Sequence, residues 1–136
     1  LDALRRIAAR LPVAAVTNGN ADLQRIGLGH LFAHQIHSRE HGAAKPEASI
    51  FHAACNLLDV PPAEVLHVGD HIEMDVLGAA RAGLRSCWIN RPEDHDGRPQ
   101  AWTDATLRPD LEFATLTALA DWLDAHPSFA TEHAAA

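Results

Sequence analysis

The chain has 136 residues, of which 47% are hydrophobic and 21% charged, so it is long enough to form one domain with a buried core. The formal net charge of −7, without any cluster of Lys or Arg, argues against a nucleic-acid-binding surface. No apolar stretch approaches the ~20 residues of a membrane span, and no signal peptide opens the chain, so we expect a cytoplasmic protein without a membrane partner.

Expected strands and helices alternate along the chain. Apolar residues at helical spacing indicate the helices, and short continuous apolar runs indicate buried parallel strands. Pro46 is expected at the first position of its helix, where a missing N–H costs nothing. The alternation predicts an α/β fold with a doubly wound, Rossmann-like parallel sheet. In chain order, we expect helices over residues 1–11, 22–26, 46–58, 75–82 and 116–123, and strands over residues 13–16, 32–37, 65–68, 84–89 and 111–114.

The remaining segments are less regular. Residues 91–110 are rich in Pro, Asp, Gly and Arg and predict a long loop. We expect residues 1–126 to form the domain and residues 127–136, which are small, polar and uncapped, to be a flexible tail. Cys55 and Cys87 have no metal-ligand spacing, and we interpret them as buried thiols in a reducing compartment.

Polar side chains adjoin three of these apolar segments. In a parallel α/β sheet, a polar residue after an apolar strand lies at the carboxyl end of that strand, where such sheets bind ligands. A hydroxyl, exposed amides, an ammonium and a pair of carboxylates then converge at one edge, and this set suits a phosphoryl group with a divalent cation. The candidate residues are Thr17, Asn18, Gly19, Lys45, Asp70 and Asp75.

In order and spacing, these segments resemble the second, third and fourth motifs of the haloacid dehalogenase superfamily, whose members are mostly magnesium-dependent phosphatases. The resemblance covers roughly residues 1–123. It implies that Thr17, Asn18 and Gly19 bind the transferring phosphoryl oxygens and that Lys45 neutralises them. It also implies that Asp70 binds Mg²⁺, with Asp75 beside it as a second carboxylate. Dehalogenases of the superfamily lack this metal-binding acid, so the two carboxylates favour phosphoryl chemistry.

Three further stretches resemble one bacterial branch of the superfamily more closely. They are residues 16–20, 66–70 and 87–92, with the sequences Val-Thr-Asn-Gly-Asn, Leu-His-Val-Gly-Asp and Cys-Trp-Ile-Asn-Arg-Pro. That branch dephosphorylates FMN and the ribitylaminouracil phosphate of riboflavin synthesis. The resemblance therefore implies a small phosphorylated metabolite as substrate.

One motif of the superfamily is missing. The first motif is an apolar strand ending in Asp-x-Asp; it carries the nucleophile and precedes a cap domain. Asp2 and Asp22 do not supply it, because neither follows a strand-like run or has an Asp two positions on. We therefore expect the C-terminal part of a longer enzyme, with a core that lacks its first central strand and its cap domain. An N-terminal segment or a second chain is then needed to complete the sheet, and the isolated chain is expected to be inactive.

A second function stays open, in which the chain is a catalytically silent fragment or a regulatory phosphate-binding domain. A response-regulator receiver also combines acids, a Thr and a Lys, but the order of these residues here fits it poorly.

Other polar and aromatic residues have simpler interpretations. Glu73 is expected to be a solvated charge, and His71 is left open as a residue facing the site. Three histidines, His34, His37 and His41, invite a zinc hypothesis, but a scattered surface set is the preferred interpretation. Trp88 and Trp102 are expected to pack in the core or at its edge rather than stack on a substrate.

Overall fold

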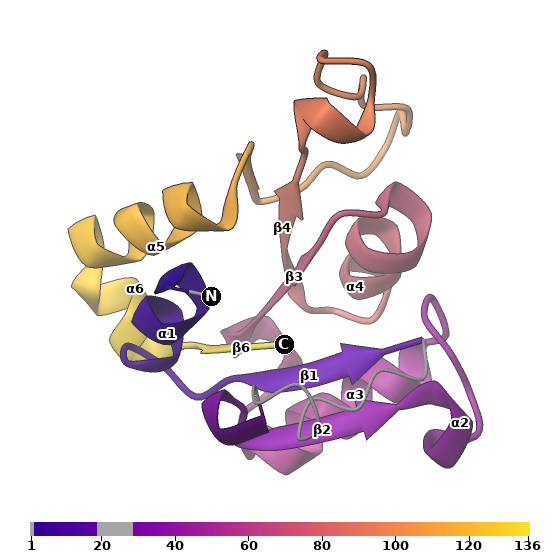
Figure 1. Ribbon diagram of the computed structural model, residues 1–136. Coiled ribbons are helices and arrows are strands. Elements are labelled where there is room, and N and C mark those ends of the chain that lie inside the picture. The colour runs from indigo at the N-terminus through magenta and orange to yellow at the C-terminus, as the bar shows by residue number, and fades with distance from the viewer. Residues whose placement is uncertain (1, 19–28) are drawn as a thin grey trace.

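A computed structural model describes residues 2–18 and 29–136 (Figure 1). The predicted helix over residues 22–26 and the site residue Gly19 lie outside this part of the chain. The helices are α1 (Asp2–Ala8), α2 (Ser38–His41), α3 (Ala48–Leu58), α4 (Gly78–Arg81), α5 (Leu116–Ala125) and α6 (Pro127–Glu132). Short helical turns are η1 (Gly29–Leu31), η2 (Pro62–Glu64), η3 (Ile72–Leu77) and η4 (Pro92–Asp94). The strands are β1 (Ala14–Thr17), β2 (His34–His37), β3 (Val65–Gly69), β4 (Arg85–Ile89), β5 (Leu111–Phe113) and β6 (Ala134–Ala135).

All strand pairs in the described residues are parallel, as the alternating pattern predicts. One sheet contains β1 and β2, and the other has the order β5-β4-β3-β6. A single bridge between Val13 and Ala135 joins the two sheets within the described residues, so β6 lies between β1 and β3. The α/β class and the parallel topology are therefore confirmed.

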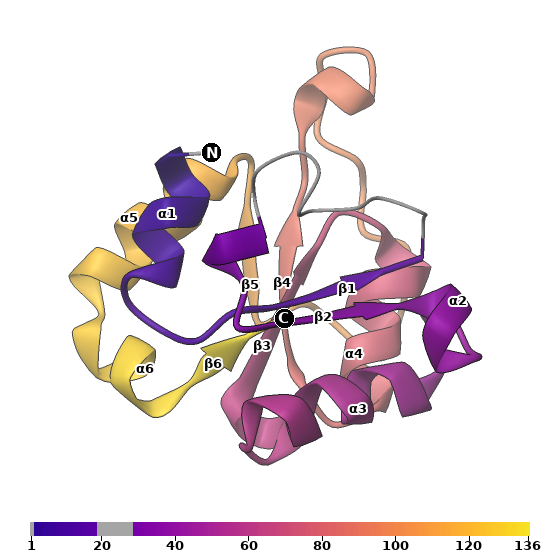
Figure 2. The same ribbon diagram turned by 60° about the horizontal axis from the view of Figure 1, so that its bottom comes forward.

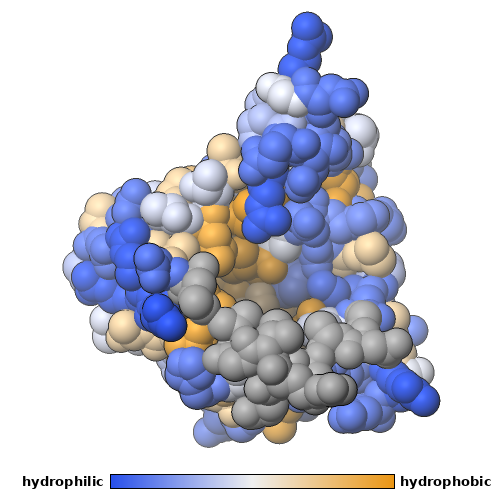
Figure 3. All heavy atoms as spheres, in the orientation of Figure 1, coloured by the Kyte–Doolittle hydropathy of each residue, from blue (hydrophilic) through white to orange (hydrophobic). Residues whose placement is uncertain are grey.

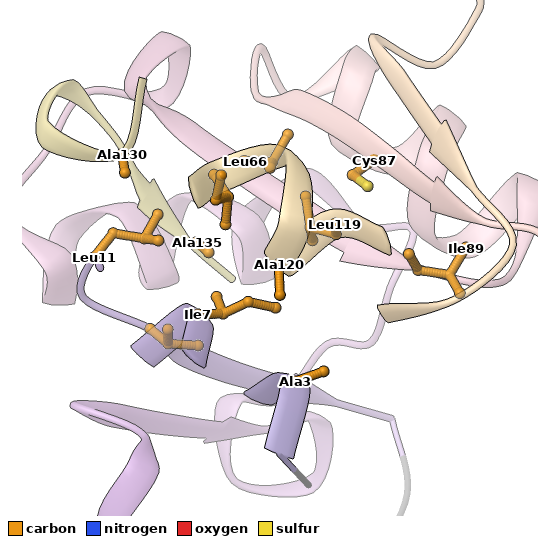
Figure 4. Close-up of a cluster of buried hydrophobic side chains, with 12 residues drawn as sticks. Ala3, Ile7, Leu11, Leu66, Cys87, Ile89, Leu119, Ala120, Ala130 and Ala135 are labelled. Atoms are coloured by element: carbon orange, nitrogen blue, oxygen red, sulfur yellow. The ribbon is translucent and has the colours of Figure 1, made fainter. Parts of the chain in front are cut away.

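Helices cover both faces of the strands (Figure 2). On one side, α1, α5 and α6 enclose a core built from strand residues such as Leu66, Cys87 and Ile89 (Figure 4). On the other side, α3 and α4 pack on Val65 and Val16. Neighbouring residues Val65 and Leu66 serve opposite cores because side chains alternate along a strand. Each face is apolar, which explains the continuous apolar runs in the sequence.

The first position of helix α3 differs from the prediction. The helix begins at Ala48, with Glu47 before it, and Pro46 lies in the preceding turn. The reason is a turn over residues 44–47, which Glu47 N closes by donating to Ala44 O at 2.9 Å, and within it the side chain of Asn18 binds both backbone polar groups of Lys45. Lys45 N donates to Asn18 Oδ1 at 2.9 Å, and Asn18 Nδ2 donates to Lys45 O at 3.1 Å. The turn therefore keeps Pro46 outside the helix, and the contacts with Asn18 hold its second residue, Lys45, in place.

The C-terminal segment also differs from its prediction as a flexible tail. Residues 127–132 form α6 and residues 134–135 form β6, and Ala130, Ala134 and Ala135 are buried. The residues of this segment are small or polar, but its alanines pair with the sheet and pack against a neighbouring apolar core. Ring stacking adds to this order, since Phe129 and His133 stack at 3.7 Å and Trp122 and His126 at 4.0 Å.

Three other expectations can be compared with the structure. Trp88 is buried and meets Trp102 edge to face at 5.3 Å, so the two rings pack on each other in the core and at its edge, as expected. Cys55 and Cys87 are buried free thiols, and burial raises the pKa of Cys87 to about 12. Among the described helices, none is both long and apolar enough to cross a membrane.

Candidate active site

The carboxyl end of β3 is the centre of the candidate site. The strand ends at Gly69, and the chain turns through Asp70 and His71 into the π-helical turn η3. The side chain of His71 caps this turn, since Met74 N donates to His71 Nδ1 at 3.1 Å. A wide π turn directs Asp75 back towards the strand, and such turns are frequent at functional sites.

Glycine is required at the end of β3 because Asp75 lies against it. A Cβ placed on Gly69 would collide with the Asp75 carboxylate. The Asp75 side chain therefore occupies the space that any other residue at position 69 would need. In the pattern Gly69-Asp70 after an apolar strand, the glycine is therefore needed for close packing with Asp75.

Asp75 is the hub of a buried polar network. Its Oδ1 lies 2.6 Å from Lys45 Nζ and 2.9 Å from His67 Nε2, and its Oδ2 accepts from His71 N at 3.1 Å. The side chains of Lys45, His67 and Asp75 are only 14%, 2% and 6% exposed. We call these three residues the buried triad.

The environment of Asp75 strongly favours its charged form. Burial alone raises the pKa of this carboxyl, but the hydrogen bond and charge of His67 and the charge and hydrogen bond of Lys45 outweigh burial. The pKa of Asp75 therefore lies well below its usual range. A carboxylate so firmly ionised holds the Lys45 ammonium in one position.

A cavity of about 280 Å³ adjoins the buried triad. Lys45, Asp75 and the exposed Asp70 line it, and Arg91 from the segment after β4 lines it as well. The cavity thus combines an ammonium and a guanidinium with an accessible carboxylate. Positive groups next to one accessible acid suit a phosphate ester bound together with a divalent cation.

Thr17 and Asn18, at the carboxyl end of β1, lie at the edge of this network. Asn18 follows β1 and clamps the backbone of Lys45, as described above, and its Nδ2 also contacts Met74 Sδ at 3.4 Å. Thr17 Oγ1 lies 3.0 Å from His37 Nδ1 and borders a neighbouring apolar cavity rather than the one beside Lys45. The structure therefore joins Asn18, Lys45 and Asp75 by direct contacts and places Thr17 next to them.

The two acids are in different situations. Both oxygens of Asp75 are engaged by protein groups, whereas Asp70 is exposed on the cavity. In the described part of the chain, no group of three or more His, Cys, Asp or Glu is arranged to hold a metal ion. Mg²⁺ uses only one or two protein carboxylates together with waters and phosphate oxygens, so this donor set fits it through Asp70.

Sequence reasoning missed two contributors, His67 and Arg91. His67 lies inside an apolar strand, where it counts as a core position, and only its contact with Asp75 shows a role. Arg91 lies in a segment expected to be a loop. The signal that could have drawn attention to His67 is a lone polar residue within the run Val65–Gly69.

The simpler interpretations of other polar residues can be set against their contacts. Glu73 pairs with Arg81 at 2.9 Å, and both side chains are 54% exposed, as expected for a solvated charge. His37 contacts Thr17, while His41 Nε2 lies 3.1 Å from Ser49 Oγ, so these two histidines have different partners. Asp94 and Asp96 lie two positions apart, but both are exposed; Asp94 is the last residue of η4 and Asp96 follows it, so neither comes after an apolar strand.

Comparison with protein families matches residues 1–83 to haloacid dehalogenase-like hydrolases. The chain belongs to this family. It is also 42% identical over 118 residues to the 5-amino-6-(5-phospho-D-ribitylamino)uracil phosphatase YigB of Escherichia coli, a match that covers 87% of this chain and 48% of YigB. A phosphoserine phosphatase of Thermus thermophilus is 40% identical over 97 residues, covering 65% of this chain and 39% of that enzyme.

Solved structures of the haloacid dehalogenase family share the fold. A 2-haloacid dehalogenase from Pseudomonas syringae superposes with a TM-score of 0.80 at 33% identity, covering 92% of this chain and 51% of that one. A family phosphatase from Thermococcus onnurineus superposes with a TM-score of 0.72 at 29% identity, covering 90% of this chain and 55% of that one. This member of the family spans about half the length of the relatives it matches.

Proposed function

We propose that this chain is the phosphate-binding part of a magnesium-dependent phosphomonoester hydrolase. The observation that carries the proposal is the buried triad beside the exposed Asp70, because it presents a fixed ammonium and an accessible carboxylate to one cavity. The similarity to phosphatases over most of the chain supports the same reaction class. The proposed substrate is a small phosphorylated metabolite, and similarity to YigB favours ribitylaminouracil phosphate or FMN.

Each residue has a proposed task. Lys45 holds the negative charge of the phosphoryl oxygens, and Asp75 with His67 keeps its amine in place. Asn18 positions Lys45 through the backbone. The resemblance to the family also assigns Thr17, Asn18 and Gly19 to the phosphate, although Thr17 lines the neighbouring cavity in this structure. Asp70 is the proposed ligand of Mg²⁺, with Asp75 next to it; the ion supplies positive charge beside the phosphate oxygens.

The attacking carboxylate is proposed to come from outside these 136 residues, because no apolar run in the sequence ends in Asp-x-Asp. A segment of the same protein or a second chain would supply it. By itself, this chain should then release no phosphate from FMN or p-nitrophenyl phosphate in the presence of Mg²⁺. Turnover that Asp70→Asn abolishes would show that the chain contains its own nucleophile.

Binding can be tested separately from turnover because Lys45 is the only lysine in the sequence. Reductive methylation with ¹³C-formaldehyde keeps its charge and gives one side-chain NMR signal besides that of the terminal amine. We expect this signal to shift when inorganic phosphate and MgCl₂ are added together. Asp70→Asn should remove the magnesium dependence, whereas the control Glu73→Gln, at an exposed ion pair, should keep it.

An unchanged Lys45 signal at saturating phosphate and MgCl₂ would contradict the proposed phosphate site. If the Lys45 signal shifted with phosphate but the shift depended on neither MgCl₂ nor Asp70, the phosphate site would be supported and the assignment of Asp70 to the metal would be contradicted.

A further inference from the structure

The segment after β4 is ordered by its own hydrogen bonds. The side chain of Asn90, directly after β4, binds both backbone polar groups of Gln100, since Gln100 N donates to Asn90 Oδ1 and Asn90 Nδ2 donates to Gln100 O, both at 2.9 Å. Trp102 Nε1 donates to Leu107 O at 2.9 Å. Residues 91–107 therefore form an ordered wall beyond the end of β4. The wall projects at the top of Figure 1, and most of its atoms are hydrophilic (Figure 3).

A cavity of about 550 Å³ lies between this wall and the turn that follows β3. Leu77 and Ile89 contribute apolar side chains to its lining. Asp70 and Arg91 line both this cavity and the one beside Lys45, so the two spaces adjoin. The volume is typical of a site for a small molecule. We call this cavity the side pocket.

Four polar side chains of the wall line the side pocket without a protein partner. They are Asp94, His95, Gln100 and Thr103. In the described part of the chain, no hydrogen bond or ion pair engages these side chains. On the other side of the pocket, by contrast, the Glu73 carboxylate is already paired with Arg81. Free donors and acceptors gathered in a concave space are available to a ligand.

The polar groups of the side pocket indicate the chemistry of the ligand. The Asp94 carboxylate only accepts hydrogen bonds, the Arg91 guanidinium only donates them, and the Thr103 hydroxyl does both. A ligand with several hydroxyl groups can satisfy all three, because each hydroxyl both donates and accepts. The carboxylates that line the pocket are those of Asp70, Glu73, Asp94 and Asp104. A ligand with a second anionic group is therefore disfavoured.

We propose that the side pocket binds the leaving group of the phosphate ester, and that this group is a polyhydroxylated chain or a sugar. The inference rests on the proposed function, because it takes the phosphate to lie in the cavity beside the buried triad. Arg91 lies where the two cavities meet, so the carbon chain passes it on the way from the phosphate. Hydroxyls of the chain then bind Asp94 and Thr103, while its C–H groups contact Leu77 and Ile89.

The order of the wall supports a role in substrate selection. Discrimination between hydroxyl and methylene groups requires polar side chains at fixed positions, because a site that rearranges can adapt to either. The contacts of Asn90 with Gln100 and the edge-to-face packing of Trp102 on Trp88 fix the backbone on both sides of Ala101. The chain itself therefore selects the leaving group.

Two matched esters test the inference. Ribitol 5-phosphate carries hydroxyl groups along its carbon chain, whereas pentyl phosphate has a chain of the same length without them. Each ester is titrated into the ¹⁵N-labelled chain with MgCl₂ present, and the amide signals of residues 94–104 report binding in the side pocket. Inorganic phosphate, followed by the signal of methylated Lys45, measures the phosphate site separately.

We expect ribitol 5-phosphate to bind at least tenfold more tightly than pentyl phosphate. The double variant Asp94→Ala, Thr103→Val should reduce this preference to less than threefold and leave the dissociation constant of inorganic phosphate unchanged. Both residues are exposed, so the fold should tolerate the change. The matched control is Asp96→Asn, an exposed acid of the same wall outside the pocket lining, whose left-handed backbone Asn tolerates. It should keep the tenfold preference.

The outcomes separate this inference from the proposed function. If inorganic phosphate binds but the two esters bind equally, or if the double variant keeps the preference, the inference is overturned and the phosphate site stands. If inorganic phosphate leaves the Lys45 signal unchanged, the proposed phosphate site is contradicted. A shift of the amides of residues 94–104 by ribitol 5-phosphate, lost in the double variant, would then support the side pocket alone. Binding of neither ester would overturn both.

Discussion

Two ion-pair clusters join distant parts of this chain, and they differ mainly in burial. In the first, Arg6 of α1 contacts Asp121 and Asp124 of α5 at 2.7 and 2.6 Å, and Arg10 contacts Asp124 at 2.9 Å. All four side chains are 37–66% exposed. The second is the buried triad, with comparable distances but side chains at most 14% exposed.

The difference teaches that short distances alone do not indicate function. Hydrogen bonds from Arg6 and Arg10 lower the pKa of Asp124, but water and salt screen this exposed cluster. In the buried triad, the same kind of contact overcomes the cost of burying Asp75, so removing one partner leaves an uncompensated charge. A buried, ionised carboxylate beside a cavity is therefore the stronger sign of a functional site.

The largest effect is expected from Asp75→Asn, which breaks the buried triad. Loss of the carboxylate charge leaves the Lys45 ammonium buried without its partner, at a cost of about 3 to 5 kcal/mol in the free energy of unfolding. Urea titration followed by circular dichroism measures this change. The matched control Asp121→Asn removes an exposed acid and should have little effect; equal losses for the two variants would contradict the comparison.

Gly69→Ala should act on the same cluster by sterics alone. The new Cβ collides with the Asp75 carboxylate, and the resulting displacement is expected to cost about 1 to 3 kcal/mol. The urea midpoint should fall, and the NMR signal of methylated Lys45 should move even without phosphate. A variant with native stability and an unmoved Lys45 signal would show that Asp75 can leave its place freely.

Asp75 also predicts a direction for the pH dependence of stability. Its folded pKa is depressed, so its contribution is fully present above the unfolded value of about 4 and is lost as the pH falls towards the folded value. Unfolding measured between pH 3 and 6 should therefore show the native chain losing more stability on acidification than Asp75→Asn. Parallel pH profiles would contradict the role of Asp75.

The smallest effect is expected for Arg6→Gln in the exposed cluster. Its ion pairs bring α1 and α5 together, but the apolar contacts of Ala3 and Ile7 with α5 residues such as Leu119 and Ala120 carry that interface. Any loss of stability should disappear in 1 M NaCl, whereas the loss in Asp75→Asn should persist. If Arg6→Gln still lost stability in 1 M NaCl, the exposed cluster would resemble the buried triad, and the contrast between the two would be wrong.

Much of the fold could be predicted because local patterns and packing agree. The apolar runs before Thr17 and Asp70 became β1 and β3, since a strand buried on both faces must be apolar throughout. The position of Lys45 just before α3 was predicted, but the start of that helix was not. Only the folded chain brings Asn18 to the backbone of Lys45 and holds Pro46 outside the helix.

The candidate site shows the same division. Its residue types were predicted from order and spacing, and Asn18, Lys45 and Asp75 are in direct contact. His67 was missed because a histidine within an apolar strand has no local signature of its partner. The segment 127–136 was predicted to be flexible, yet its alanines fill a position between β1 and β3 that no local pattern describes.

The sequence by itself determined the parallel α/β class and the polar groups that end its strands, because both follow from periodicity over a few neighbouring residues. Only the tertiary structure decided which acid is buried and which is exposed, and which segment lies between the two sheets. Those outcomes depend on contacts between residues far apart in the chain, where burial and hydrogen bonding outweigh local preference.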